Sequence, residues 1–303
     1  MLKTKEYKIT QAVAHIVCLF FTLCALLPFI LLVVGSFTDN SWAVTNGFTF
    51  FPTKWSINAY QYIVEKWAVI GRAYMMTLAV TGIGTFISLL ISTMFAYGIS
   101  KSHIPGMKLV SFLLIFTMLF NGGLVSTYYC YIKLYHIKNT FAALVVPGLL
   151  MNAFNVILIR NYFINSIPIS LEEAARIDGA NEFLIFSRII MPLSKPIIAT
   201  VGLMAALAYW NDWQNGLYYL SDRGGSQFYT IQIVLNNIND DVRALVQTMT
   251  SGSMGGMSTS IADIPTTTMR MAIAVIGILP ILVLYPFFQK YFVKGITLGG
   301  VKE

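Results

Sequence analysis

Asp212 is an ionisable residue inside a long apolar stretch, where charges are rare. It lies in the run Trp210-Asn211-Asp212-Trp213, directly after Tyr209. An ionisable side chain within a membrane-spanning stretch is by default a candidate functional residue. In that interpretation Asn211 and Asp212 bind hydroxyl groups of a polar substrate. The ring of Tyr209, Trp210 or Trp213 then stacks on its faces. In the alternative, the tryptophans form an aromatic belt at the membrane surface and Asp212 simply reaches water.

A second candidate site occupies the polar loop between residues 160 and 195. Ser170, followed three residues later by Glu173, is a predicted capping box that starts a short helix over residues 171–178. Gly179 comes next, at the position where the end of a helix needs a left-handed residue. The loop is therefore expected to begin with a short, well-delimited helix and a sharp turn.

The same loop is predicted to continue into a second short helix over residues 181–190, which ends before Pro192. On the first helix, four residues share one side at helical spacing: Leu171, Ala174, Ala175 and Asp178. The two alanines keep that side narrow, so that another protein surface can approach closely. A helix lying on lipid headgroups instead needs a wide apolar face and a Lys- and Arg-rich polar face. The loop has neither, which favours docking on a protein partner.

The other reactive residue types form no recognisable site. No two of the histidines have metal-ligand spacing on one helix: His15, His103 and His136. The cysteines are too few and too scattered for a disulfide framework and are interpreted as small hydrophobic residues: Cys18, Cys24 and Cys130. The sequence also lacks a Gly-x-x-x-x-Gly-Lys-Ser/Thr run, which cradles the phosphates of ATP. We therefore expect no cofactor in this chain.

The composition places most of the chain in a membrane. Hydrophobic residue types make up 56% of the sequence and charged types only 11%. An ordinary soluble domain has about a quarter of its residues charged. The formal net charge of +7 is modest, and membrane proteins collect Lys and Arg in their cytoplasmic loops. Since no RNA- or DNA-binding motif is present, nucleic acid is not an expected partner.

A transmembrane helix needs about 20 apolar residues to cross the hydrocarbon core. Charge-free stretches predict six spans, over residues 9–38, 73–100, 109–132, 139–159, 196–211 (continuing past Asp212 to 220) and 271–289. Asp212 lies roughly 24 Å along a helix that enters near Pro196, in the outer part of the bilayer. The predicted fold class is an all-α integral membrane protein with six transmembrane helices. We expect a single transmembrane domain over residues 1–303, without an internal repeat.

The distribution of Lys and Arg predicts the orientation in the membrane, since these residues crowd cytoplasmic ends. With the N-terminus inside, twelve of the 20 Lys and Arg residues fall on the inner side and eight on the outer side. Both termini and the loop 160–195 are then cytoplasmic. The segment 222–270, which holds a glycine- and serine-rich run at 251–256, is extracytoplasmic.

The inner loop resembles a known family motif. Glu173-Ala174-Ala175, Gly179, Ile189 and Met191-Pro192 match the EAA loop of binding-protein-dependent ABC importer permeases at every fixed position. Met191 stands where that family usually has Leu. The whole spaced pattern, in the longest inner loop of a six-span chain, is far more specific than a bare Glu-Ala-Ala. The resemblance covers most of the chain and is weakest over residues 222–270.

Other segments point to one branch of that family. The residues flanking the motif and the pair Trp210-Asn211 resemble the sugar-importer branch. The tail from Gln289 to Lys302 is similar to the tails of maltose-type second permeases. Asn121-Gly122-Gly123 further resembles a subgroup that handles oligosaccharides or larger glycans.

The resemblance implies a type I ABC importer permease in a bacterial or archaeal plasma membrane. Its partners would be a second permease in a heterodimer, two cytoplasmic ATPase subunits that use ATP and Mg, and an external solute-binding protein that delivers a sugar. The chain itself would not be an enzyme. The residues that would couple it to the ATPase are those of the matched loop: Glu173, Ala174, Ala175, Asp178, Gly179, Ile189 and Pro192.

Two other function classes compete with this interpretation. An ion-coupled secondary transporter or a channel would need no ATPase, and such proteins often show repeats and buried charges. Only Asp212 fits that description. A membrane enzyme would need a cluster of acid, base, nucleophile or metal-binding residues, which the nearly charge-free spans do not provide. Copurification with an ATPase subunit separates the three classes.

Overall fold

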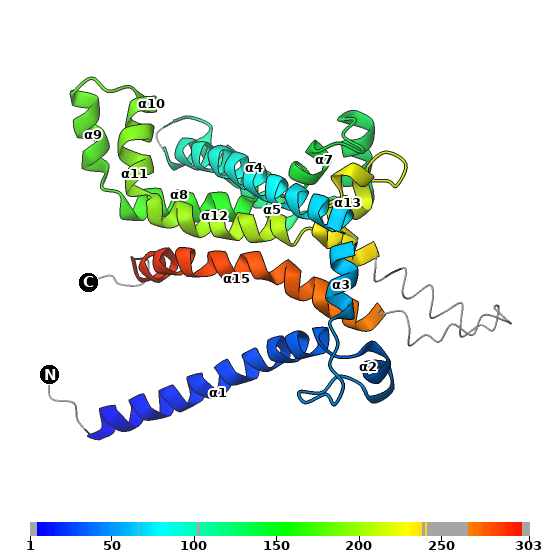
Figure 1. Ribbon diagram of the computed structural model, residues 1–303. Helices are drawn as coiled ribbons and strands as arrows, with labels where there is room; N and C mark the ends of the chain where they lie inside the picture. The colour runs from blue at the N-terminus through cyan, green and yellow to red at the C-terminus, as the bar shows by residue number, and fades with distance from the viewer. Residues whose placement is uncertain (1–4, 66, 102–103, 238–239, 241–265, 299–303) are drawn as a thin grey trace. The chain divides into compact units, whose positions relative to one another are not determined.

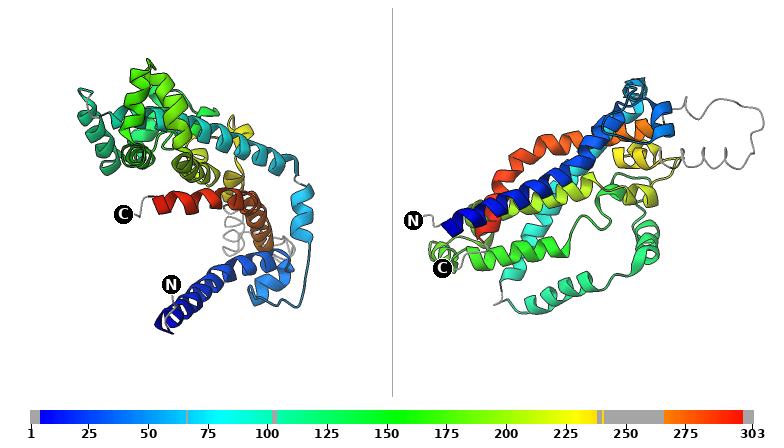
Figure 2. Two further views of the ribbon diagram at one scale, coloured as in Figure 1. Left: turned by 90° about the vertical axis from the view of Figure 1, so that its left-hand side faces the viewer. Right: turned by 90° about the horizontal axis from the view of Figure 1, so that it is seen from below.

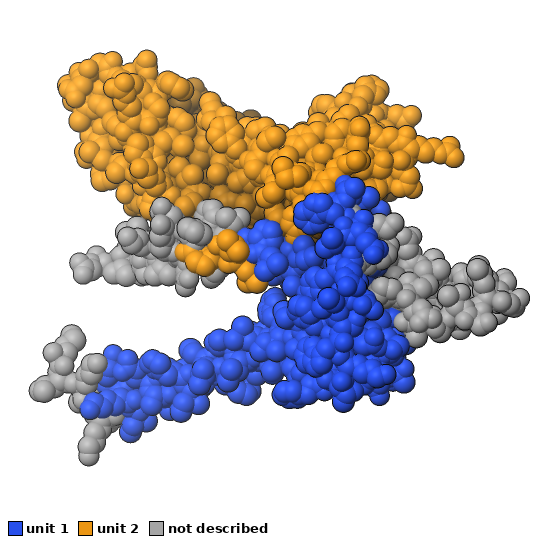
Figure 3. Space-filling model, in the orientation of Figure 1, with its two compact units in different colours: residues 1–70, 235–280 blue, residues 71–234, 281–303 orange. Residues whose placement is uncertain are grey.

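The computed structural model describes residues 5–65, 67–101, 104–237, 240 and 266–298. Within these residues the named elements are all helices, with one isolated β-bridge between Thr38 and Trp55. The all-α prediction is thus confirmed. Most of the predicted outer segment 222–270, including the run 251–256, lies outside the described residues, as does the end of the tail at 299–303. The chain divides into two compact units (Figure 3).

The first unit comprises residues 1–70 and 235–280. Its helices are α1 (Lys5–Ser36), α2 (Asn40–Asn46), α3 (Asn58–Glu65) and the beginnings of α4 (Trp67–Ser100) and α15 (Thr266–Leu298). The helix α1 is one continuous element in all views (Figure 2). None of its most apolar stretch is buried within the chain, so its apolar surface requires lipid or another protein as its environment.

Polar side chains fasten the elements of this unit to one another. The Ser36 hydroxyl, at the end of α1, lies 2.8 Å from the Tyr60 hydroxyl of α3. Asp39 accepts a hydrogen bond from the backbone N–H of Trp42 (3.1 Å) and so caps α2. Asn40 accepts a hydrogen bond from the N–H of Thr267 at the start of α15 (3.3 Å). These contacts join the end of α1 to α3 and the start of α2 to the start of α15.

The second unit comprises residues 71–234 and 281–303. After most of α4, its elements are α5 (Met107–Leu119), α6 (Gly123–Tyr129), the π-helix η1 (Cys130–Leu134), α7 (Ala142–Val145), α8 (Ala153–Ser166), α9 (Ile169–Ile177), α10 (Glu182–Ile185), the π-helix η2 (Phe186–Ile190), α11 (Met191–Leu193), α12 (Lys195–Trp210), α13 (Gln214–Tyr219) and the 3-10 helix η3 (Ser226–Phe228). Figure 1 shows α9 to α11 gathered at one end of α4, α8 and α12, with α7 and α13 at the other.

Two apolar clusters form the core of this unit. The larger joins α4, α5, α8, α12 and the α9–α11 region through fully buried side chains such as Ile159, Ile185 and Ile190. The other lies around Tyr209, with Val80 and Leu144. The Tyr209 hydroxyl donates a hydrogen bond to the Val145 carbonyl (2.9 Å), so its one polar group is satisfied.

The structure supports only part of the predicted span pattern. Among the described residues, two helices are long and apolar enough to cross a membrane alone, Tyr7–Ser36 and Trp67–Ser100. Two broken pairs pass the same test together, with bends of 117° and 80°: Met107–Leu119 with Gly123–Leu134, and Glu182–Leu193 with Lys195–Trp210. A shorter apolar helix covers Thr267–Val283. The count of six spans therefore stays a prediction.

The predicted span over residues 139–159 is not formed by one continuous helix. The helix α7 ends at Val145, and Gly148 has a left-handed backbone with φ 70°. Asn152 then caps α8 by accepting hydrogen bonds from the N–H groups of Phe154 (2.9 Å) and Asn155 (3.3 Å). A count of uncharged residues cannot detect such a break, because proline, glycine and asparagine carry no charge.

Close packing of Gly84 against Tyr209 leads to a stability prediction. A Cβ atom at Gly84 would lie 2.7 Å from the Tyr209 ring, whereas one at Gly82, on the same helix, would meet nothing within 4 Å. We expect Gly84→Ala to destabilise the fold by about 1–3 kcal/mol through overpacking. Gly82→Ala should leave stability unchanged or raise it by up to about 1 kcal/mol. Thermal unfolding of both purified variants in detergent checks this, and equal melting temperatures would contradict it.

Candidate functional site

The loop helix α9 starts earlier than its sequence pattern predicts. Its N-cap is Pro168, with φ −62° and ψ 129°, and no side chain caps it. Ser170 and Glu173 both lie inside the helix, so the predicted capping box is wrong. Pro168 explains the difference, because its ring fixes φ near the helical value and its missing N–H needs no partner at this position. The Leu171 N–H bonds the Pro168 carbonyl (3.2 Å) and closes the first turn.

The left-handed turn at Gly179 is confirmed, with φ 82°. The Gly179 N–H donates to the Arg176 carbonyl (3.0 Å) and the Ala180 N–H to the Ala175 carbonyl (2.9 Å). This pair of bonds is the Schellman motif, which satisfies the last carbonyls of a helix. Asn181 then caps α10 by accepting a hydrogen bond from the Leu184 N–H (2.8 Å). The turn between the two helices is therefore fixed by backbone hydrogen bonds on both sides.

The second loop helix runs through Pro192 rather than stopping before it. The helical path continues from α10 through the π-helix η2 into α11, which contains Pro192. In η2 the Met191 N–H bonds the Phe186 carbonyl, five residues back. A single wide turn of this kind often stands where a regular helix is disturbed. It lies immediately before the proline, whose ring would clash with a regular helical turn.

The predicted docking residues do not all face the same way. Ala175 is buried in the core of the second unit, so it holds α9 against its own chain. Glu173, Ala174, Asp178 and Gly179 are exposed. Of the remaining loop residues, Ile189 is half-buried and Pro192 is exposed.

Large apolar side chains also protrude from this loop. The exposed fraction is 86% for Ile177 and 72% for Phe183, on opposite sides of the Gly179 turn. Ile169 and Leu171 are exposed as well. Such a group of apolar side chains, among the charges of a polar loop, is typical of a surface that another protein covers.

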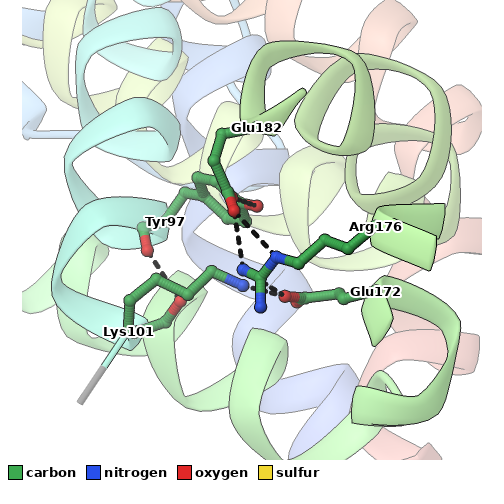
Figure 4. A network of polar contacts seen from close by, with 6 residues as sticks. Tyr97, Lys101, Glu172, Arg176 and Glu182 are labelled. Carbon is green, nitrogen blue, oxygen red and sulfur yellow. Dashed lines mark hydrogen bonds and ion pairs between the residues drawn. The ribbon is translucent and has the colours of Figure 1, made fainter. Parts of the chain in front are cut away.

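A network of charges holds this loop on the end of α4 (Figure 4). Lys101, just beyond α4, forms an ion pair with Glu172 of α9. The Tyr97 hydroxyl donates to Glu182 Oε2 of α10 (2.7 Å), and Arg176 Nη2 lies 2.7 Å from Glu182 Oε1. The Lys101 ammonium also lies 4.4 Å from the centre of the Tyr97 ring. Two loop helices are thus bonded to one membrane helix and to each other.

Burial makes part of this network energetically important. The side chains of Lys101 and Glu172 are only 10% and 12% exposed. Removal of Lys101 would leave buried Glu172 with only the more distant Arg176, at 4.0 Å, as a cation. Glu182 is more exposed. The Tyr97 hydrogen bond is the main cause that lowers the pKa of its carboxyl, opposed by partial burial and reinforced by Arg176. The carboxylate form that both partners need is therefore favoured.

The second candidate segment, residues 209–213, is partly buried in the core and partly exposed. Tyr209 and Trp210 are 2% and 3% exposed and are buried in the core, and neither is among the lining residues of the cavity beside Asp212. Asn211 and Trp213 are exposed, and the Asn211 amide donates to the Leu207 carbonyl (2.9 Å). The predicted aromatic stacking by Tyr209 and Trp210 is therefore not supported.

Asp212 has a structural partner that its sequence pattern did not reveal. Its Oδ1 accepts hydrogen bonds from the backbone N–H groups of Gln214 (3.1 Å) and Asn215 (3.2 Å), at the start of α13. It also lines an open cavity of about 370 Å³. The other lining residues come from 121–127, 147–149 and 214–219. An aspartate shortly before a helix commonly accepts hydrogen bonds from the first N–H groups of that helix, and this preference was the available signal for the bend.

Comparison with known proteins shows which family has this architecture. Residues 76–298 match the family model described as "Binding-protein-dependent transport system inner membrane component". The chain is 39% identical over 284 residues to the polygalacturonan/rhamnogalacturonan transport system permease protein YtcP of Bacillus subtilis, covering 94% of this chain and 95% of that protein. It is 26% identical to the arabinooligosaccharides transport system permease protein AraQ of Bacillus subtilis, with 94% of each chain covered.

A solved structure agrees with these matches. It is a bacterial ABC transporter involved in the import of the acidic polysaccharide alginate, with a TM-score of 0.77 and 30% identity. The superposition covers 95% of this chain and 98% of that chain. The chain belongs to the family of binding-protein-dependent transport system inner membrane components.

The buried ion pair leads to a prediction about loop attachment. We expect Lys101→Met to destabilise the protein by about 3–5 kcal/mol, because Glu172 stays buried without its close cation. Glu172→Gln should act similarly. The double variant should be less destabilised than the sum of the two, because no charge of the pair is left unpaired. Thermal unfolding of the four proteins gives the interaction free energy.

The matched control for this cycle is Lys108→Met, which removes an exposed lysine of α5. Its effect should stay within about 0.5 kcal/mol. Strictly additive effects at Lys101 and Glu172 would show that the pair does not hold the loop.

Proposed function

We propose that the chain is the membrane-spanning permease subunit of an ATP-driven, binding-protein-dependent importer for oligosaccharides or larger glycans. Family membership supports the transport role. The names of similar proteins cover polygalacturonan, rhamnogalacturonan, arabinooligosaccharides and alginate, all of them glycans. The sequence motif of the loop supports the same assignment.

The observation that carries the proposal is the geometry of the loop 169–193. Its two helices are held at a fixed angle by the Gly179 turn and bonded to α4 through Glu172 and Glu182. At the same time it presents Ile177 and Phe183 to the outside. A rigid projection with an apolar tip can transmit a displacement from a partner, whereas a flexible loop would absorb it. We assign this tip to a cleft of a separate ATPase subunit.

The remaining partners follow from the same assignment. Two ATPase subunits supply ATP hydrolysis with Mg, a second permease completes a heterodimer, and an external binding protein delivers the glycan. The exposed apolar surface of α1 would face lipid and the second permease. The chain itself carries out no chemical reaction, and alternating access moves the solute.

The proposed orientation has six crossings in a bacterial or archaeal plasma membrane, with both termini and the loop 160–195 in the cytoplasm. The fourth crossing would be made by α7 and α8 together, since the break after Val145 divides it. The segment 222–270 would be extracytoplasmic. The distribution of Lys and Arg supports this orientation.

Gly179 provides the test of coupling. Its surroundings are open, with nothing within 4 Å of an added Cβ atom, so a substitution acts through the backbone alone. We expect Gly179→Val to cost on the order of 1 kcal/mol or more locally and to change the direction of the loop. The variant should reach the membrane but lose ATPase copurification, binding-protein-stimulated hydrolysis and uptake in reconstituted vesicles.

Gly179→Asn is the matched control, because asparagine tolerates the left-handed conformation far better than valine. It should keep most of the uptake. Glu173→Lys, which reverses an exposed charge without touching a cap, should weaken ATPase binding. If the Val and Lys variants transport like the parent, the loop does not couple. Uptake driven by an ion gradient without ATP would refute the importer assignment.

The orientation is checked with single cysteines in a chain from which Cys18, Cys24 and Cys130 have been removed. Asn165→Cys and Gln227→Cys replace exposed residues at the two expected sides. An impermeant thiol reagent applied to intact cells should label position 227 only, and permeabilised cells should be labelled at both. Labelling of position 165 but not 227 in intact cells would reverse the orientation.

A further inference from the structure

The cavity beside Asp212 is the meeting point of three breaks in the helical structure. One break separates α5 from α6 at Asn121, another separates α7 from α8 at Pro147 and Gly148, and the third separates α12 from α13 at Asp212. Residues from all three breaks line the same cavity. In an apolar environment, non-helical backbone is tolerated only where protein buries it or where it lines a water-filled space. Three coincident breaks therefore mark a cavity, with both polar and apolar lining residues, that the fold maintains.

Hydrogen bonds make these breaks rigid. Asn121 accepts a bond from the Gly123 N–H (2.9 Å), and Asp212 accepts two at the start of α13. The Asn215 amide, which is buried, donates to the Pro147 carbonyl (3.0 Å) and so joins two of the breaks. A cavity whose walls are fixed in this way loses little conformational entropy when it binds a ligand.

The lining has the chemistry of a site for uncharged polyols. The residues of its lining that carry polar side-chain groups are Asn121, Thr127, Asp212, Gln214, Asn215, Tyr218 and Tyr219. The described lining residues include no Lys or Arg. A carboxylate accepts strong hydrogen bonds from hydroxyl groups, but an acidic ligand would meet its negative charge without a compensating cation. The volume of about 370 Å³ lies within the usual range of small-molecule sites, about 300–1,000 Å³.

We propose that this cavity is a subsite for one neutral glycosyl residue of the transported chain, and that Asp212 makes it discriminate against a uronate residue at that position. This inference rests on the proposed import of glycans and adds the charge class of the sugar that this subunit contacts. Asp212 is then both a specificity-determining residue and the cap of α13.

The variant Asp212→Asn separates these two roles. Asparagine caps helices about as well as aspartate, so the fold of α13 is retained while the negative charge is lost. The experiment uses the complete transporter with its ATPase and binding protein in vesicles. The probes are galacto-oligosaccharides and galacturono-oligosaccharides of equal length and linkage, which differ only in CH₂OH against carboxylate. Comparing parent and variant with one binding protein cancels the selectivity of that protein.

We expect Asp212→Asn to lower the ratio of neutral to uronate uptake by about tenfold or more, the factor typical of one hydrogen bond to a charged group. Thermal stability should stay close to that of the parent, because asparagine keeps the hydrogen bonds to the start of α13. Asp222→Asn makes the same chemical change at an exposed aspartate outside the described lining, bonded by Tyr229. It should leave the ratio unchanged.

Each other outcome has a definite meaning. An unchanged ratio in Asp212→Asn, whether or not total uptake falls, overturns the subsite and leaves Asp212 as a helix cap alone. A parent transporter that imports only the uronate series overturns it as well. If the parent shows no ATP-dependent uptake of either series, the proposed function fails and the subsite fails with it. If the parent imports the neutral series and the variant has the same ratio of neutral to uronate uptake, the proposed function stands and only the subsite is overturned.

Discussion

The need of the backbone for hydrogen bonds in an apolar environment determines where this chain can bend. A helix satisfies its own N–H and C=O groups, so each interruption must find other partners. Asn121, Asn152 and Asp212 supply side-chain oxygens to the N–H groups after three breaks. At the loop, the Schellman bonds at Gly179 do the same for the last carbonyls of α9. The bends are thus located by short polar residues and glycine, and the candidate sites lie at those bends.

Structural features that depend on neighbouring residues could be predicted from the sequence more readily than contacts between residues far apart in the chain. The Gly179 turn depends on neighbouring residues, and its prediction is confirmed. The capping box at Ser170 also had a local pattern but was wrong, because Pro168 offered a competing start two residues earlier. The pairing of Lys101 with Glu172 joins residues 71 positions apart, and no periodicity connects them. The burial of Tyr209 likewise depends on Gly84 of another helix.

The family could be predicted from the sequence more readily than the site, because the loop motif is local in the sequence and the cavity is not. A docking loop must match a partner surface, which fixes residue types at close spacing along the chain. The Asp212 cavity is assembled from three separate segments, each contributing only a few common polar residues. Aromatic residues near Asp212 suggested stacking on a sugar, yet burial assigned Tyr209 and Trp210 to the core. The charge of Asp212 was the useful signal, and its partners became evident only in the fold.

The helices α4 and α12 connect the two ends of the second unit. The helix α12 begins at Lys195, shortly after α11 of the loop 169–193, and ends two residues before Asp212. The helix α4 carries Tyr97 near the loop, and further back along the same helix Gly84 packs against the Tyr209 ring. A residue larger than glycine at position 84 or 202 would press on Tyr209 or Leu89, so the two helices approach closely at both points. Because packed helices shift as rigid elements rather than deforming continuously, a displacement of the loop must reach the cavity roughly 24 Å along α12. The same rigidity that fixes the loop angle therefore makes the geometry of the Asp212 cavity depend on the position of the loop 169–193.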